Sequence, residues 1–385
     1  MKTNAMKRRS AIKLTVASAA TVLLPRQSKA APAVNVATPE VIDVSVGHYS
    51  GWPTLAKRSN GQLVLVASGT RESHVCPFGS VQFYRSHDQG RTWLLPQTIL
   101  DTPIDDRDAG ILETNQGTLL ATTFTSNAYV SILEKAQQEG NWEANRLKRW
   151  HAAHSRVTSE ELQATLGTWM IRSTDGGITW TKPYDCILNS PHGPIQLSNG
   201  RQLYVGKHLW REDGYIGSVI SEDDGQSWKP QARIPTREGD DSARYHELHA
   251  VEAPSGKLIA HIRNHNKSNA GETLQSESSD GGATWSVPHS IGVWGFPSHL
   301  LRLKDGRLLM SYGYRRGSMG NQARLSEDEG KTWSEPMTLS DEAANYDLGY
   351  VTTVELSEGQ FLSVWYEKLA DSSKAVLRQT RWSLG

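Results

Sequence analysis

An eight-residue pattern occurs five times in this chain and constrains its fold more than any other feature. The pattern is S-x-D-x-G-x-[T/S]-W, and its copies lie at residues 86–93, 173–180, 221–228, 278–285 and 326–333. The Ser and Asp side chains can accept hydrogen bonds from the amides of a tight turn, and the Gly supplies a left-handed backbone position. The Trp brings a large apolar ring, which we expect to pack beneath the next repeat. Five copies of one turn indicate a chain built from repeated units.

A second repeat, a glycine turn between two apolar strands, alternates with the first. Its turns are Asn60-Gly61, Gln116-Gly117, Asn199-Gly200, Ser255-Gly256, Asp305-Gly306 and Glu358-Gly359. Flanks that alternate or run apolar are typical of β-hairpins. Six hairpins and five Trp turns define six units of about fifty residues, a period typical of propellers. The sequence therefore predicts an all-β, six-bladed β-propeller over residues 31–385, with a strand at 41–46 that closes the ring against the last unit, 350–384.

One interval in the second unit is too long for a single blade. Gly117 and Gly200 are 83 residues apart, and the surplus at 134–166 is rich in helix formers and lacks strand alternation. Thr158 followed by Glu161 indicates a helix start, because a threonine hydroxyl can cap the first turn. We predict a helical insertion in the second blade, which serves as a lid or an oligomer contact rather than as a separate domain.

The first thirty residues have the features of an export signal. Lys7-Arg8-Arg9-Ser10 precedes a mild apolar run at 14–24, and Ser28-Lys29-Ala30 offers a small-residue cleavage site. An arginine pair followed by a lysine is typical of a twin-arginine signal peptide, here residues 1–30, and an ordinary secretory signal is the alternative. Both predict a periplasmic or secreted bacterial protein. The apolar run is too short for a membrane anchor.

Removal of this leader changes the net charge of the chain. The sequence has 41 basic and 41 acidic residues, and seven of the basic ones precede residue 31. The remaining 34 bases against 41 acids give a net charge of −7, which argues against nucleic acid or an anionic membrane as a partner. Cys76 and Cys186 would lie in an oxidising compartment, but their spacing does not decide whether they pair.

Polar residues gather at equivalent points of the six units, just before the first strand of each hairpin and just after the second. In a propeller these points face one common side, because the innermost strands line a central channel. Strand ends are loops, which are polar in any fold, but these residues are mainly Arg, His, Glu and Tyr. Several arginines in an acidic protein favour a ligand with a carboxylate, since a guanidinium binds a carboxylate through two parallel hydrogen bonds.

The octapeptide resembles the Asp-box, and the whole chain after residue 30 resembles the sialidase (neuraminidase) superfamily. Retaining sialidases use a Tyr nucleophile paired with a Glu, three arginines that grip the substrate carboxylate, and an Asp as acid/base. The segment 350–356 resembles the strand that opens with the nucleophile, and Glu247 resembles the partner Glu. The resemblance implies that Tyr350 and Glu247 are catalytic. A neutral phenol suits this role, because a carboxylate would be repelled by an anionic anomeric centre.

The resemblance also implies a set of arginines that bind the substrate. Arg263 resembles the second carboxylate arginine. Arg315 is the choice for the third, with Arg316 and Arg324 as alternatives. Arg71 resembles a further arginine that lines the sugar pocket. The implied ligand is an acidic carbohydrate or a glycoconjugate that carries one.

Two positions depart from the family pattern. Gly51-Trp52-Pro53 stands where sialidases have Arg-Ile-Pro, so the first carboxylate arginine is absent. The acid/base Asp has no clear counterpart in the first unit, and Asp106, Glu72 and Asp108 are the substitutes, of which Asp106 and Glu72 enter the predicted site. The acidic sugar therefore need not be sialic acid itself.

Histidines are also frequent at these strand ends. Those predicted to bind the substrate are His74, His192, His246, His265 and His299. They either donate hydrogen bonds to sugar hydroxyls or act as general acids and bases on a uronate together with Tyr350. His246 and His249 would alternate unfavourably in a strand as metal ligands, so we predict no metal and no cofactor.

These observations lead to one leading function and two alternatives. The leading function is an exported glycoside hydrolase of the sialidase type that acts on a terminal acidic sugar of a glycan. One alternative is a polysaccharide lyase that uses a His–Tyr pair on a uronate, and the other is a non-catalytic carbohydrate-binding propeller. A lyase leaves an unsaturated sugar that absorbs in the ultraviolet, whereas a hydrolase does not.

Overall fold

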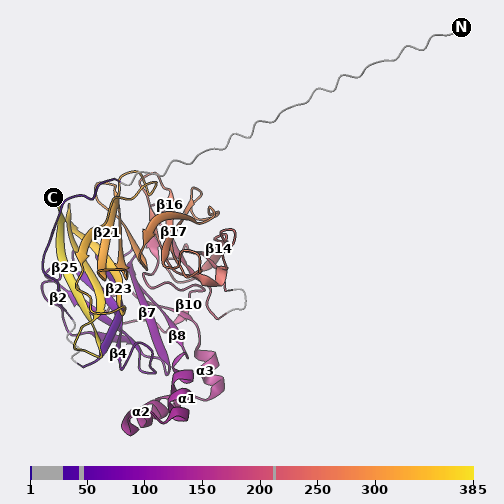
Figure 1. Cartoon of the computed structure of the whole chain (residues 1–385), viewed down its shortest axis with the longest axis vertical. Coiled ribbons are helices and arrows are strands. Elements are labelled where there is room, and N and C mark those ends of the chain that lie inside the picture. Colours follow the sequence, from indigo (N-terminus) through magenta and orange to yellow (C-terminus); the bar gives the residue numbers. More distant parts are fainter. Residues whose placement is uncertain (2–28, 43–46, 211–213) are drawn as a thin grey trace.

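The computed structural model describes Met1 and residues 29–42, 47–210 and 214–385 (Figure 1). These residues form six antiparallel sheets arranged as the blades of a propeller. The predicted all-β, six-bladed architecture is confirmed. Nearly all of the predicted signal peptide, and residues 43–46 of the predicted closing strand, lie outside the described residues.

Within each blade the strands pair in the order in which they occur in the chain. The first three blades are β3–β6 (Tyr49–Lys57, Leu63–Arg71, Ser80–Ser86, Gln97–Leu100), β7–β10 (Asp105–Glu113, Leu119–Ser126, Thr168–Ser173, Tyr184–Asp185) and β11–β14 (Ile195–Gln196, Gln202–Lys207, Ile216–Ser221, Lys229–Arg233). The fourth and fifth are β15–β18 (Tyr245–Glu252, Leu258–Asn264, Glu272–Ser278, His289–Trp294) and β19–β22 (Ser298–Arg302, Leu308–Tyr314, Gly320–Ser326, Met337–Ser340).

The sixth blade joins the two ends of the described chain. Its strands β23–β25 (Leu348–Ser357, Gln360–Lys368, Ala375–Leu384) are completed by β1 (Val34–Val36) and β2 (Glu40–Val41), which both pair with β25. The N-terminal segment therefore closes the ring, as predicted. Pairing with β25 begins at Val34 rather than at Val41, because two short strands, β1 and β2, form where one strand was predicted.

Each Asp-box turn is held by its own side chains. In the first copy, the amide of Gly90 donates to Ser86 Oγ at 2.7 Å and the amide of Thr92 donates to Asp88 Oδ1 at 2.9 Å. The other four copies make the same two bonds. The sequence pattern therefore encodes the turn directly, because the Ser and Asp side chains of each copy accept hydrogen bonds from amides of the same turn.

The expected direction of Trp packing is wrong. Trp93 of the first blade donates from Nε1 to Gln379 of the sixth, and Trp285 of the fourth blade donates to Ser218 of the third. Each Trp thus docks on the preceding blade, because its turn lies against that blade. A Cβ added at Gly90 would lie 2.6 Å from Leu362 of the sixth blade, so only glycine fits this contact.

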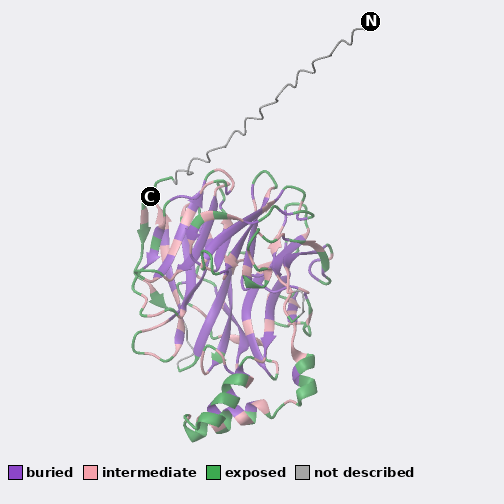
Figure 2. Ribbon diagram, turned by 45° about the vertical axis from the view of Figure 1, so that its right-hand side comes forward, coloured by how far each residue is buried: buried purple, intermediate pink, exposed green. Residues whose placement is uncertain are grey.

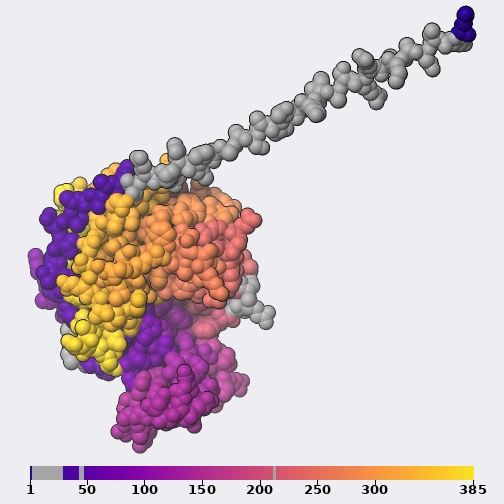
Figure 3. Space-filling model, viewed as in Figure 1, coloured from indigo at the N-terminus to yellow at the C-terminus, as the bar shows by residue number. Residues whose placement is uncertain are grey.

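The predicted helical insertion is present in the second blade, between β8 and β9. It consists of α1 (Tyr129–Glu139), α2 (Ala144–His154) and α3 (Ser159–Thr165), and it begins five residues before the predicted boundary. Thr158 and Glu161 form a capping box at the start of α3, as the sequence indicates. The helices project from one end of the propeller as a lobe (Figures 1 and 3).

Burial follows this division between blades and lobe. The blade strands are largely buried, whereas much of the helical surface is exposed (Figure 2). The lobe packs on the first blade through a small core that includes Trp150, Tyr129 and Cys76. Cys76 and Cys186 are both buried and unpaired, in separate clusters. In the part of the chain that the structure describes, we find no helix with the length and apolar character needed to cross a membrane.

Candidate functional site

Four of the six inner strands are bulged near their first residues, and one residue in each bulge has a left-handed backbone. These residues are Trp52 in β3 (φ 54°), Asp108 in β7 (φ 47°), Glu247 in β15 (φ 31°) and Tyr350 in β23 (φ 55°). Such a backbone costs about 1–3 kcal/mol in a non-glycine residue, and a bulge changes the direction of a side chain. The same strain at equivalent points of four blades indicates a functional site.

Glu247, Arg263 and Tyr350, three of the predicted site residues, meet at these bulges. Tyr350 Oη donates to Glu247 Oε1 at 2.5 Å, and Arg263 Nη1 pairs with Glu247 Oε2 at 2.5 Å. Arg263 Nη1 also lies 3.3 Å from Tyr350 Oη. We refer to these three residues as the triad. The side chains of Glu247 and Arg263 are only 18% and 12% exposed, so their interaction takes place largely out of water.

The triad holds its proton on the phenol rather than on the carboxyl. Burial alone would raise the pKa of Glu247, but the charge of Arg263 and the hydrogen bonds from Tyr350 and Arg263 outweigh it and lower that pKa. Burial, reinforced by the charge of Glu247, raises the pKa of Tyr350 well above its ordinary value. Glu247 is therefore an ionised base in contact with a neutral phenol.

Asp108 is the fourth polar group at this point. It is 7% exposed, and among the described residues its Oδ1 atom has no hydrogen-bond partner. Burial raises the pKa of Asp108 to about 7, with the nearby charge of Glu247 acting in the same direction and that of Arg107 opposing it. Asp108 can therefore give or take a proton near neutral pH.

The structure does not bring Glu72 and Asp106 to the triad. Glu72 pairs with Arg146 at 2.6 Å and Arg149 at 3.1 Å, both on α2, so its carboxylate ties the helical lobe to the first blade. Asp106 is fully buried and accepts hydrogen bonds from the amide and hydroxyl of Thr102. Both carboxylates were predicted as catalytic from their position near strand ends, and both have structural partners instead.

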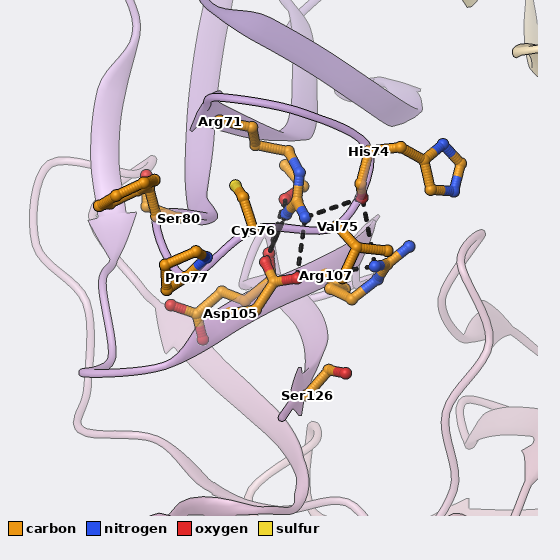
Figure 4. A network of polar contacts seen from close by, with 12 residues as sticks. Arg71, His74, Val75, Cys76, Pro77, Ser80, Asp105, Arg107 and Ser126 are labelled. Atoms are coloured by element: carbon orange, nitrogen blue, oxygen red, sulfur yellow. Dashed lines mark hydrogen bonds and ion pairs between the residues drawn. The ribbon is translucent and has the colours of Figure 1, made fainter. Parts of the chain in front are cut away.

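Arg71 is close to the site but has no exposed surface. Its Nη1 atom pairs with Asp105 at 2.6 Å (Figure 4), and its guanidinium lies 4.8 Å from the ring centre of Trp52. Arg107 lies 4.6 Å from the same ring. Trp52, which replaces the arginine of the family pattern, is thus flanked by two guanidinium groups. Sequence reasoning passed over Arg107, although it lies next to Asp106 and Asp108 at the start of an inner strand.

Arg315 lies close to the triad, against the same aromatic ring as Arg263. Its Nη2 atom donates to the carbonyl of Leu348 at 2.6 Å. The ring of Phe296 is 5.1 Å from the guanidinium of Arg315 and 4.1 Å from that of Arg263. The two alternatives for this position differ: Arg324 bonds to Tyr312 inside the fifth blade, and Arg316 is exposed.

Three of the predicted histidines surround the triad. His265 Nε2 accepts from Arg263 Nε at 2.6 Å, and the rings of His246 and His265 are 4.8 Å apart. Burial lowers the pKa of His246 to about 4, and the charge of Lys207 adds to this shift. His74 lies on the other side, where its Nδ1 atom is 2.9 Å from Asp347 Oδ1. The role of each as a substrate contact stays a prediction.

His192 and His299 lie deeper, in the central channel. Together with His249 they form a packed group, the histidine cluster, whose ring centres are 4.7–5.4 Å apart. They line a cavity of about 440 Å³ that the inner strands enclose and that the triad does not line. No set of three or more metal-type side chains in the described ranges is placed to hold a metal ion.

Comparison with known proteins agrees with this architecture. Residues 140–364, more than half of the chain, match the family model of the BNR repeat-like domain. The chain therefore belongs to the BNR repeat-like family, within the sialidase-type six-bladed propellers.

Two sialidases are distant relatives of the chain. The sialidase of Clostridium perfringens is 25% identical over 249 residues, which cover 65% of this chain and 50% of that enzyme. The sialidase of Bacteroides fragilis is 24% identical over 317 residues, which cover 74% of this chain and 53% of that enzyme. The chain thus spans about half the length of the sialidases it matches.

Solved structures share the fold at low sequence identity. A protein of unknown function from Dyadobacter fermentans superposes with a TM-score of 0.73 at 22% identity, covering 91% of this chain and 99% of that one. The NanB sialidase of Streptococcus pneumoniae superposes with a TM-score of 0.64 at 15% identity, covering 89% and 70%. At these identities the likeness shows the fold alone.

Proposed function

We propose that this chain is an exported glycoside hydrolase that removes a terminal acidic sugar from a glycan, with Tyr350 as its nucleophile. The observation that carries the proposal is the triad, in which a neutral phenol donates at 2.5 Å to a carboxylate that an arginine keeps ionised. The distant relationship to two sialidases supports the same reaction class. Export rests on the sequence of residues 1–30.

In the first step, Tyr350 Oη attacks the anomeric carbon of the bound sugar while Glu247 takes the phenolic proton. The bond from that carbon to the leaving oxygen breaks, and Asp108 supplies the proton that this oxygen needs. Asp108 suits the role because its raised pKa, about 7, keeps a proton available at neutral pH. Water then attacks the same carbon while Asp108 takes a proton from the water. The bond from that carbon to Tyr350 Oη breaks, and Glu247 returns its proton to the departing phenolate.

The cations around the triad favour an acidic sugar. Arg263 and Arg315 both lie close to the Phe296 ring, and Arg315 bonds to a carbonyl rather than to a carboxylate. A sugar carboxylate that binds between them would accept bidentate hydrogen bonds. Because Trp52 stands where the family pattern has its first carboxylate arginine, we include uronic acids beside sialic acid as the sugar that is cleaved.

A lyase is the second candidate, and one observation favours it. His246 and His265 have pKa values lowered by burial, so both are neutral bases near neutral pH, and His265 contacts Arg263 directly. An arginine that neutralises a uronate carboxylate next to a neutral base is an arrangement suited to proton removal. A product that absorbs in the ultraviolet would decide for this reaction.

The test is Tyr350→Phe, assayed with 4-nitrophenyl glycosides of sialic acid, glucuronic acid and galacturonic acid. The variant loses the nucleophile but keeps the ring in its packing, so we expect hydrolysis to fall by at least about 10³-fold with the fold intact. Titration calorimetry with the corresponding free sugars should show unchanged affinity. Hydrolysis that survives in Tyr350→Phe would contradict the proposal, and the absence of hydrolysis of any glycoside by the unmodified chain would favour a binding propeller.

A further inference from the structure

A pocket of about 490 Å³ lies between the fourth, fifth and sixth blades, next to the triad. Its walls carry three guanidinium groups and three aromatic rings, and we refer to it as the arginine pocket. These residues are Arg244, Arg315, Arg316, Trp294, Phe296 and Tyr346. The volume falls in the range of about 300–1,000 Å³ that is usual for ligand sites in proteins.

The arginine pocket shares a wall with the triad. His265 lines the pocket and accepts a hydrogen bond from Arg263, which belongs to the triad. Phe296 also belongs to this wall, because its ring centre is 4.1 Å from the guanidinium of Arg263 and 5.1 Å from that of Arg315. A group bound in the pocket is therefore one side chain away from the proposed place of cleavage.

Two of the three guanidinium groups of this pocket lack the acidic partners found elsewhere in the described part of the molecule. Arg315 donates to the carbonyl of Leu348 and Arg316 to that of Ala270. Within the described part of the chain, neither has a carboxylate at ion-pair distance. The carboxylate nearest to Arg244 is that of Asp241, at 4.0 Å, and both of these side chains are 61% exposed. The residues that line the pocket include no Asp and no Glu.

Buried arginines near the triad are neutralised in a different way. Arg263 pairs with Glu247 at 2.5 Å and Arg71 with Asp105 at 2.6 Å. Around the pocket, Arg315 and Arg316 bond to carbonyls and Arg244 has only an exposed acidic partner, so the three positive charges repel one another and attract an anion. A bound carboxylate or sulfate would relieve this repulsion through charge-assisted hydrogen bonds.

The aromatic rings of the pocket suit the flat apolar face of a sugar. Tyr346 lines the pocket and is 70% exposed, so its ring is accessible to a ligand. The guanidinium of Arg316 lies 5.2 Å from the ring centre of Trp294. Aromatic walls with a few charged groups are typical of sites that bind and orient a polar ligand.

We propose that the arginine pocket is a second subsite, which binds a carboxylate or sulfate ester on the sugar adjacent to the one that is cleaved. This inference rests on the proposed function, because it takes the triad as the place of cleavage. The substrate is then a glycan with negative charge on two neighbouring sugars, rather than one acidic sugar at the end of a neutral chain.

The test measures binding to the Tyr350→Phe chain, in which cleavage is blocked. Three sets of disaccharides, ending in sialic acid, glucuronic acid or galacturonic acid, each carry a second sugar that is neutral, carboxylated or sulfated. We expect at least one set in which a dianionic member binds at least about tenfold more tightly than the neutral-second-sugar member, measured by titration calorimetry at low salt. Comparison of the affinities of the carboxylated and sulfated disaccharides then shows which anion the pocket prefers.

Variants assign this preference to the pocket. Arg244→Gln combined with Arg316→Gln should reduce the affinity difference between the dianionic and monoanionic disaccharides to less than about twofold. The affinity for the monoanionic disaccharide should stay unchanged. Arg91→Gln, an exposed arginine in the first Asp-box, is the matched control and should change neither affinity. A preference that survives the double substitution, or the absence of a preference in all three sets, overturns the inference. Failure of the proposed function is a separate result, because it is seen in the hydrolysis assay and not in binding.

Discussion

The triad and the histidine cluster meet on one inner strand, β15, yet their electrostatics are opposite. Glu247 and His249 are two residues apart in β15. Glu247 is ionised and accepts hydrogen bonds from Arg263 and Tyr350. His249 accepts a hydrogen bond from the backbone amide of Leu300 and stacks on His299 at 4.7 Å. One end of the strand therefore holds paired charges, and its middle holds neutral rings.

The cause of this difference is depth in the channel. Burial lowers the pKa of His299 to about 3, and it also lowers those of His192 and His249. All three are neutral at physiological pH, because a positive charge on any of them would lose its hydration in the channel. A second positive charge would also be repelled by the first. At the strand start, the bulges bring charges of opposite sign together. Position along the inner strand, rather than residue type, thus decides where acid–base chemistry can take place.

Arg263→Met breaks the paired region and has the largest expected effect. It leaves the largely buried Glu247 without its cation, and removal of one partner of a buried pair costs about 3–5 kcal/mol. We expect the free energy of unfolding, measured in urea, to fall by that amount and hydrolysis to be lost.

A second substitution separates lost pairing from lost packing. Glu247→Gln added to Arg263→Met removes the unpaired charge, so the double variant should regain at least half of the lost stability without regaining hydrolysis. If the single variant unfolds at the same urea concentration as the unmodified chain, the triad is not an electrostatic unit.

The fold could be predicted from the sequence because each turn is encoded by local hydrogen bonds. Ser86 and Asp88 satisfy amides within four residues of themselves, and Thr158 caps its own helix. Local bonds of this kind do not depend on the rest of the molecule. The packing of Trp93 does depend on the rest of the molecule, because it is set by the blade against which the turn lies. The sequence pattern contains no information on which blade that is.

The site was predictable only where it follows from the repeat. Glu247, Arg263 and Tyr350 stand at equivalent strand ends, and those ends converge in any propeller. The choice between Asp106 and Asp108 depends on a bulge between Arg107 and Gly110, which turns Asp108 towards the triad and leaves Asp106 with Thr102. Bulges have no periodic signal in a single sequence.

Asp108→Asn tests whether acid–base chemistry takes place at the start of the inner strands, where Asp108 lies in β7. With a pKa of about 7, Asp108 carries its proton below neutral pH, so kcat/KM of the unmodified chain should fall as pH rises above about 7. The variant should lose this alkaline limb, and its kcat should fall by about 10²-fold on glycosides with a poor leaving group. On 4-nitrophenyl glycosides the loss in kcat/KM should be much smaller, because kcat/KM reports the first step and that leaving group needs no proton.

Asp106→Asn is the matched control for this prediction, since Asp106 is equally buried on the same strand. Its pH profile should keep the alkaline limb even if the protein is less stable. An alkaline limb that persists in Asp108→Asn would remove Asp108 from the mechanism.

The histidine cluster should make the fold sensitive to acid. Above pH 6.5 the three histidines are neutral in both folded and unfolded chains, so stability is at its full value. Below pH 6.5 the unfolded chain takes up protons that the folded chain refuses, because the folded pKa values are lowered, to about 3 for His299. Each histidine then removes about 1.4 kcal/mol of stability per pH unit until its folded pKa is reached.

His299→Leu removes one of these groups and should lower the slope of unfolding free energy against pH between 6 and 5 by about 1.4 kcal/mol per unit. Urea unfolding at a series of pH values measures this slope. His87→Gln, at an exposed position, is the control and should leave the slope unchanged. Equal slopes for His299→Leu and the unmodified chain would show that the cluster takes up protons without unfolding.

His74→Asn has the smallest expected effect and tests whether an exposed histidine near the triad differs from the buried histidine cluster. His74 belongs to the triad's side of the molecule, but its side chain is 47% exposed, and it pairs with Asp347 at 2.9 Å. A pair of this exposure contributes less than about 1 kcal/mol, so the free energy of unfolding at pH 7 should fall by no more than that. A change in slope as large as that of His299→Leu would mean that an exposed histidine behaves like a buried one. Depth in the channel would then not be what separates the two regions, and the assignment of acid–base chemistry to the strand start would lose its physical basis.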